Sequence, residues 1–223
     1  MLKYLVGLVV IIIIAVGGYY VWEGFGGSGA PPTDTTEQVQ QPTTSTYATT
    51  SFSVVYPSDF TSDDKYAYAG FPKKPIAGVK LTIPGAMAAG TNLSNDTYVS
   101  VETLPNAKKC TGDIYLVDDV NAHVETQGGV NYSIATSSDA GAGNFREEMV
   151  YALRESSPCV AIRYFIHSTN IGNYLPAQAG DPGTVREFDR AALLSSFDAI
   201  RASVRLAGDT ATSTAPAPST STP

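Results

Sequence analysis

The sequence predicts an α+β protein: an antiparallel β-sheet with a C-terminal helix packed on one face, preceded by one N-terminal transmembrane helix. Three features lead to this prediction. Apolar and polar residues alternate through much of residues 52–166, an apolar stripe with helical spacing follows near the C-terminus, and an apolar run occupies residues 4–22.

Period-two alternation locates the strands. It predicts them at residues 52–56, 79–83, 99–101, 122–124, 130–134 and 149–153. Residues 160–166 are apolar on both faces except for Arg163, which is typical of a central strand. The sequence Gln127-Gly128-Gly129 predicts a tight turn and therefore favours antiparallel neighbours.

One helix is marked near the C-terminus. Thr184 and Glu187 have the spacing of a capping box, so we expect the helix to begin there, after the breaker at residues 181–183. An apolar stripe with spacings of four, three and four residues follows, made of Leu193, Phe197, Ile200 and Val204. We expect this stripe to pack on the sheet, with Asp189 and Asp198 in water.

The N-terminal run is long enough to cross a membrane. A bilayer core is spanned by roughly 20 helical residues, and Tyr19, Tyr20 and Trp22 end the run as side chains at a lipid interface do. Lys3 precedes the run and acidic residues follow it, so by the positive-inside rule we expect the N-terminus in the cytoplasm and the rest of the chain outside it. A cleaved signal peptide is the alternative, although Pro31 follows the small residues that a peptidase requires.

Composition divides the chain into four segments. We expect a transmembrane anchor at 1–23, a disordered tether at 24–50, an extracytoplasmic domain at 51–207 and a disordered tail at 208–223. The tether and the tail are rich in Gly, Pro, Thr and Ser, and they cannot bury enough apolar surface to offset the entropy lost on ordering.

Charge and motifs exclude several classes of function. The net charge is −7, from 14 Lys and Arg against 21 Asp and Glu, so we expect no nucleic-acid partner. Residues 139–144 resemble a phosphate-binding loop only superficially because no Gly-Lys-Ser/Thr ending follows, so no cofactor is expected. His123 and His167 lack zinc-type ligand spacing to the cysteines, so we expect no metal.

Two cysteines, Cys110 and Cys159, lie in the predicted extracytoplasmic domain. Disulfides persist in that compartment and an even count leaves no thiol unpaired, so we favour a disulfide between them. Two unpaired buried thiols are the alternative.

The least ordinary segment leaves the predicted central strand. His167, Asn170, Asn173 and Tyr174 lie in a long polar loop that leads to the helix. Long loops in compact domains are often functional, so we take these four residues as candidate binding residues. The alternative is a structural loop that caps the sheet through hydrogen bonds from asparagine side chains to the backbone.

Two classes of function follow. We favour a membrane-tethered, non-catalytic binding or structural module with a protein or cell-envelope partner, because no catalytic cluster is visible. The alternative is an extracytoplasmic hydrolase that uses His167 and a carboxylate such as Glu147 or Glu148.

The chain also resembles known proteins. The anchor, the tether, the Phe-Ser-Val-Val-Tyr-Pro opening at 52–57 and the closing residues 197–204 resemble small extracytoplasmic domains of the PsbP-like α/β/α sandwich class. Residues 141–144, 167–174 and 185–189 are similar to uncharacterised anchored proteins of candidate-phylum bacteria. The PsbP-like resemblance implies a non-enzymatic binding or assembly domain with an antiparallel sheet, and neither resemblance implies a functional residue.

Overall fold

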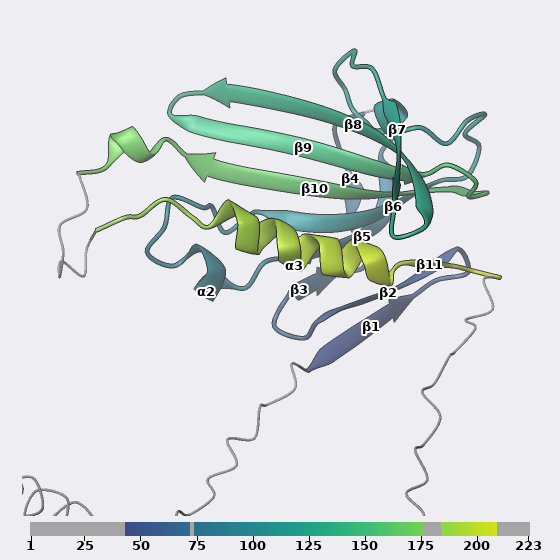
Figure 1. The fold of residues 1–223 in the computed structure, drawn as a ribbon, viewed down its shortest axis with the longest axis horizontal. Helices are drawn as coiled ribbons and strands as arrows, with labels where there is room; N and C mark the ends of the chain where they lie inside the picture. Colours follow the sequence, from purple (N-terminus) through teal and green to yellow (C-terminus); the bar gives the residue numbers. More distant parts are fainter. Residues whose placement is uncertain (1–42, 72–73, 176–183, 209–223) are drawn as a thin grey trace, which may run out of the picture. The chain divides into compact units, whose positions relative to one another are not determined.

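The computed structural model describes residues 43–71, 74–175 and 184–208 (Figure 1). The predicted anchor, most of the tether and nearly all of the tail lie outside the described residues. Among the described residues, no helix has both the length and the apolar character needed to cross a membrane.

The described chain forms two antiparallel sheets. The smaller sheet has the order β1-β2-β11, and its strands are Thr44–Ala48, Phe52–Pro57 and Arg205–Leu206. The larger sheet has eight strands in the order β3-β5-β6-β10-β9-β8-β7, with β4 paired to β5. Its strands in chain order are β3 Thr61–Asp63, β4 Ala67–Tyr68, β5 Ile76–Thr82, β6 Tyr98–Leu104, β7 His123–Gln127, β8 Val130–Gly141, β9 Asn144–Leu153 and β10 Cys159–Thr169.

Helical segments are few among the described residues. The longest is α3, Arg190–Ser203, which runs along the larger sheet (Figure 1). Three short helices complete the fold: α2 at Gly85–Ala88, η1 at Gly112–Tyr115 and η2 at Ile171–Asn173. A mostly antiparallel sheet with one long C-terminal helix confirms the predicted α+β class.

The predicted turn between β7 and β8 is confirmed. Gly128 and Gly129 have φ angles of 58° and 81°, and Gln127 pairs with Val130. A two-residue hairpin turn with both φ angles positive matches the twist of the flanking strands, and glycine adopts it without steric cost. The sequence therefore fixes the register of this hairpin locally.

The stripe of α3 packs where predicted. Leu193, Phe197 and Ile200 are 3%, 0% and 1% exposed, and they share one core cluster with Val54 of β2 and Ile162 of β10. Strand β10 lies between β6 and β9, which confirms the central strand. Burying such large apolar side chains contributes about 1.5–3 kcal/mol each.

The predicted start of the helix is wrong. The helix begins at Arg190, and its N-cap is Asp189, whose side chain accepts a hydrogen bond from the Ala192 backbone N–H at 2.9 Å. Residues before it are held by the segment that follows α2: the Arg186 N–H donates to the Gly90 carbonyl at 3.0 Å, and the Arg186 carbonyl accepts from the Asn92 N–H at 2.9 Å. In a helix that started at 184, the Arg186 carbonyl would instead accept a hydrogen bond from the N–H of residue 190. The bond from Asn92 therefore takes the place of a helical one.

The predicted tether boundary at residue 50 also needs correction. Strand β1 lies inside the predicted tether, and Tyr47 on it packs against Phe52 with ring centroids 6.1 Å apart. Composition alone missed this strand because its other members are Thr, Ser and Ala, which gain stability from pairing with β2 rather than from their own burial.

Candidate functional site

The four predicted binding residues lie at the end of the larger sheet where β10 gives way to η2. His167 is on β10, opposite Arg146 of β9. Its Nδ1 lies 2.8 Å from Asp96 Oδ1, and its Nε2 lies 3.0 Å from Asn144 Oδ1. The imidazole is 13% exposed while the Asp96 carboxylate is 62% exposed, so both nitrogens of a mostly covered ring have protein partners.

The asparagines hold the loop in place. The Asn170 side chain accepts a hydrogen bond from the Gly172 N–H at 2.9 Å and caps η2. The backbone N–H of Asn170 donates to the Gly143 carbonyl at 2.8 Å, and Asn173 Nδ2 lies 3.5 Å from the same oxygen. These contacts join η2 to the β8–β9 turn, which is the structural role considered for this loop from the sequence.

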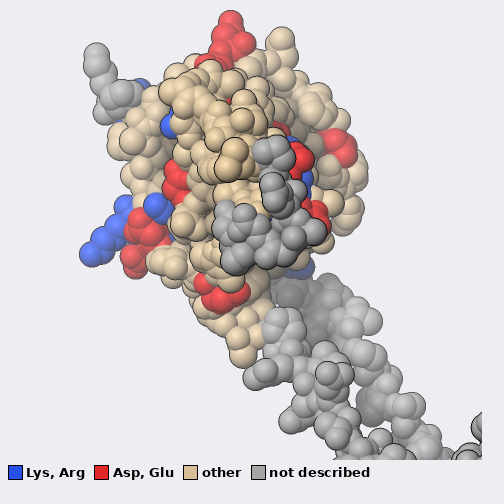
Figure 2. All heavy atoms as spheres, turned by 90° about the vertical axis from the view of Figure 1, so that its left-hand side faces the viewer, with Lys and Arg blue, Asp and Glu red and all other residues tan. Residues whose placement is uncertain are grey.

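Tyr174 combines an internal contact with exposure. Its hydroxyl lies 2.8 Å from Thr169 Oγ1, and the residue is 37% exposed. Ile171 and Leu175 in the same loop are 38% and 88% exposed. Figure 2 views this end of the domain and shows mostly uncharged surface, with acidic and basic side chains scattered over it. The loop therefore presents apolar side chains on an asparagine-braced support.

The structure does not bring together the carboxylates expected for a hydrolase. Glu147 binds Arg190 with a 2.7 Å contact, and Glu148 binds Arg163. The carboxylate that contacts His167 is Asp96, which lies before β6. The pairing of His167 with Glu147 or Glu148 is therefore wrong: Glu147 lies opposite Ile166, on the other face of the sheet, and Glu148 is held by Arg163.

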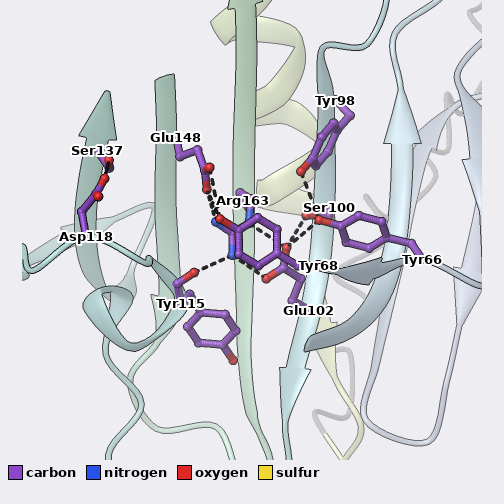
Figure 3. A network of polar contacts seen from close by, with 10 residues as sticks. All are labelled: Tyr66, Tyr68, Tyr98, Ser100, Glu102, Tyr115, Asp118, Ser137, Glu148 and Arg163. Carbon is purple, nitrogen blue, oxygen red and sulfur yellow. Dashed lines mark hydrogen bonds and ion pairs between the residues drawn. The ribbon is translucent and has the colours of Figure 1, made fainter. Parts of the chain in front are cut away.

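A larger group of charged side chains than the one at His167 surrounds Arg163 in the middle of β10 (Figure 3). Arg163 and Glu102 side chains are both 0% exposed, and they form a two-point contact, with Nε to Oε1 at 2.8 Å and Nη2 to Oε2 at 2.9 Å. Nη2 also donates to the Tyr115 carbonyl at 2.7 Å, and Nη1 donates to Glu148. A buried cation is stable when hydrogen bonds and opposite charge replace its lost water, as they do here.

Aromatic side chains enclose this ion pair. The Arg163 guanidinium carbon lies 3.6 Å from the centroid of the Tyr68 ring, and the Tyr68 hydroxyl donates to Glu148 at 3.2 Å. Glu102 accepts further hydrogen bonds from Ser100 at 2.7 Å and from Tyr66 at 3.3 Å. Every member therefore has a partner, and the network braces the face of the sheet opposite α3.

Burial and charge together set the pKa values in this network. Burial opposes the charge of Arg163, but its hydrogen bonds to Glu102 and the negative charges of Glu102 and Glu148 raise its pKa above the usual value. Burial raises the pKa of Tyr68 to about 12, with Arg163 opposing the rise and Glu148 adding to it. At neutral pH Arg163 is therefore charged and Tyr68 is neutral, as their mutual contacts require.

The predicted disulfide is present on the same face as the Arg163 network. Cys110 and Cys159 are bonded with their Cα atoms 5.2 Å apart, joining the chain before η1 to the first residue of β10. The Tyr115 hydroxyl donates to the Cys159 carbonyl at 2.8 Å. Gly112 of η1 lies so close to β8 that an added Cβ would be 2.7 Å from the Ala135 nitrogen. The bridge thus holds η1 over Arg163.

Sequence reasoning identified Arg163 as the exception in an apolar strand but not its partners. Glu102 and Ser100 share its face because Ser100 lies directly opposite Arg163, and β-strand residues two apart point the same way. These contacts require β6 to be the neighbour of β10, and the sequence alone did not establish that strand order. Among the described residues, no group of three His, Cys, Asp or Glu side chains is placed to hold a metal ion.

Comparison with known proteins gives no relative. No family model, no curated protein and no solved structure matches this chain.

Proposed function

We propose that this chain is a membrane-tethered extracytoplasmic module that binds a protein or cell-envelope component without catalysis. In this proposal the apolar run at 4–22 is the membrane anchor, and the segment from His167 to Tyr174 is the recognition surface. A PsbP-like binding or assembly role belongs to the same proposal. The Cys110–Cys159 disulfide supports an extracytoplasmic location for the domain, since such bonds are rare in the cytosol.

One observation carries the non-catalytic part. Both ring nitrogens of His167 contact other side chains, Asp96 and Asn144, rather than a hydroxyl or thiol. A catalytic base must be within hydrogen-bond reach of its nucleophile, and this histidine has that position filled by an amide oxygen. The arrangement supports a role for His167 in bracing the loop against β9 and the segment before β6.

A hydrolase is the second candidate, and the 2.8 Å contact between His167 and Asp96 is the observation that favours it. A carboxylate at Nδ1 is how a catalytic imidazole is oriented. If the purified chain turns over generic ester, peptide or glycoside substrates and His167→Ala abolishes that turnover, this candidate replaces the binding module.

Partner capture tests the recognition surface. Bait protein carrying Tyr174→Ser and Leu175→Ser should lose capture from a solubilised cell-envelope fraction while its melting temperature stays nearly unchanged, because both residues are exposed. Val124→Ser on edge strand β7, where the residue is 57% exposed, is the matched control and should keep capture. If the wild type, the double variant and the Val124→Ser control capture the partner equally well, the recognition surface is not at this loop.

Membrane fractionation tests the membrane anchor. The protein that pellets with membranes should retain Met1 or Leu2 and resist extraction at alkaline pH. A released form that begins near Pro31 would show instead that the apolar run is a cleaved signal peptide.

A further inference from the structure

A groove is lined by residues of the β7–β8 turn, the end of β9, the C-terminus of α3 and β11. Figure 1 shows that these elements meet at the opposite end of the larger sheet from η2. Its volume is about 750 Å³, within the range of sites for small molecules. Apolar side chains of Leu153, Val204 and Leu206 line part of it. Neither the His167 loop nor the Arg163 network contributes a residue to this groove.

Arg201 of α3 lines the groove and is unusual. Its side chain is only 9% exposed, and its Nε and Nη1 atoms are buried without a hydrogen-bond partner among the described residues. The guanidinium carbon lies 4.1 Å from the Tyr151 ring centroid and 5.1 Å from that of Tyr132. Aromatic faces attract the cation, but they do not replace the hydrogen bonds that these two nitrogens would make in water.

The carboxylate beside Arg201 compensates its charge only in part. Asp198 Oδ1 accepts a hydrogen bond from Arg201 Nη2 at 3.0 Å, and the same oxygen accepts one from the Tyr164 hydroxyl at 2.8 Å. Asp198 is itself 51% exposed, so water screens its charge more than that of the covered guanidinium. Arg201 therefore keeps an attraction for a second anion.

Two more arginines line the same groove. Arg154 and Arg205 are exposed, and together with Arg201 they face two carboxylates, those of Glu155 and Asp198. The lining is locally cationic by one charge in a chain whose net charge is −7. Burial raises the pKa of Tyr132, and the charges of Arg201 and Arg205 both oppose that rise, which indicates that both cations lie near this hydroxyl.

The helix end does not cancel this attraction. A helix C-terminus repels anions through its free carbonyl groups. Here Arg205 Nη1 donates to the Ala202 and Val204 carbonyls at 2.7 and 2.9 Å, which places a guanidinium over the last turn. The Ser203 hydroxyl donates to the Ile200 carbonyl at 2.7 Å, so the exposed carbonyls near the groove are largely satisfied.

We propose that this groove is a binding site for a small monoanionic carboxylate that carries an apolar group, with Arg201 as the covered cation and Arg154 and Arg205 as the outer ones. The guanidinium fork of an exposed arginine matches a carboxylate in shape, whereas the covered Arg201 acts through its charge. The single excess positive charge of the lining matches one negative charge. The apolar wall accommodates the rest of the ligand. This site is independent of the recognition surface proposed for the His167 loop.

Titration of the full chain in non-ionic detergent micelles tests the site, with benzoate as the probe and benzamide as its neutral counterpart. Calorimetry, corrected with micelles alone, should show saturable benzoate binding and at least about tenfold weaker benzamide binding. Raising the salt from about 20 to 200 mM should weaken benzoate binding, because the outer cations are exposed and screened.

Arginine variants locate the binding within the groove. Arg154→Gln and Arg205→Gln should each weaken benzoate binding about threefold to tenfold, and Arg201→Met should weaken it further, while Arg201→Lys retains part of it. The matched control is Arg146→Gln, an exposed arginine on β9 at the other end of the sheet, which should bind as the wild type does.

Several results would overturn the proposal. These are no saturation by about 10 mM benzoate, equal binding of benzoate and benzamide, or equal loss in the Arg146 control. Tighter binding of inorganic phosphate than of benzoate would overturn the ligand class. If Arg201→Met does not fold, the Arg154→Gln and Arg205→Gln variants still test the site. The site is refuted if both of these variants bind benzoate as tightly as the wild type does.

Discussion

Replacing Arg163 with methionine should destabilise the domain more than any exposed change of charge. The substitution leaves the Glu102 carboxylate, which is 0% exposed, without the cation that contacts both of its oxygens. Removing one partner of a buried ion pair costs about 3–5 kcal/mol. A typical domain is stable by about 5–15 kcal/mol, so this is a large share.

Urea denaturation is the suitable assay, because urea, unlike guanidinium chloride, does not screen charges. With a slope of about 2 kcal/mol per molar urea, a loss of about 4 kcal/mol lowers the midpoint by about 2 M. Arg146→Met is the matched control on β9, and it should shift the midpoint by less than about 0.3 M because Arg146 is exposed.

A double variant separates a lost charge pair from lost packing. Arg163→Met together with Glu102→Met removes both charges, so its cost should fall at least about 2 kcal/mol below the sum of the two single costs. Additive costs, or a midpoint shift under about 0.5 M for Arg163→Met, would refute the argument that each charge is buried only because the other is present.

Three further predictions rest on the fold. Phe197→Ala should cost about 3–5 kcal/mol and lower the melting temperature by about 10 °C, since the ring is 0% exposed; a shift of a degree would remove it from the core. Asp189→Ala should cost about 1 kcal/mol and Thr184→Ala under about 0.5 kcal/mol in urea denaturation, and the reverse order would restore the earlier helix start. The pKa of Tyr68 is raised to about 12 in the folded protein, from about 10 in the unfolded chain. The contribution of Tyr68 to the free energy of unfolding is therefore complete below about pH 10 and should fall between about pH 10 and 12. In Tyr68→Phe the free energy of unfolding should fall less steeply over that range.

The sequence predicts those features of the fold that depend on neighbours along the chain. The apolar spacing of α3 and the glycine pair at the β7–β8 turn each follow from a single local pattern, and both are confirmed. The disulfide is also confirmed, on the basis of cysteine count and compartment. Features that depend on residues far apart in the chain could not be predicted in the same way.

The start of α3 shows why. Thr184 and Glu187 carry the spacing of a cap, but residues 186–188 bond to residues 90–92, more than 90 positions earlier. That pairing competes with the local preference and succeeds because it satisfies backbone groups on both segments. The N-cap role therefore passes to Asp189, which the sequence had assigned only to solvent.

The candidate sites follow the same division. The His167 loop was visible in the sequence as a long polar segment, yet the partner of His167 at Nδ1, Asp96, lies 71 positions away. The Arg163 network was visible only as one charge in an apolar strand. Its partners Glu102 and Glu148 come from the two strands that flank β10, and the sequence did not establish that order.

Arg201 is the residue that sequence reasoning missed most completely. It follows the apolar stripe of α3 near the helix C-terminus, where a cation is expected for its interaction with the last carbonyl groups. Phe197 lies one turn earlier, so Arg201 falls on the same helix face and over the sheet. Tyrosines on three adjacent strands, Tyr132, Tyr151 and Tyr164, lie beneath it, and their rings cover the guanidinium that composition would have placed in water. Two buried nitrogens without hydrogen bonds lower stability, and the stacked tyrosine rings and the contact with Asp198 offset only part of that cost. The charge of the proposed anionic ligand would offset more of it.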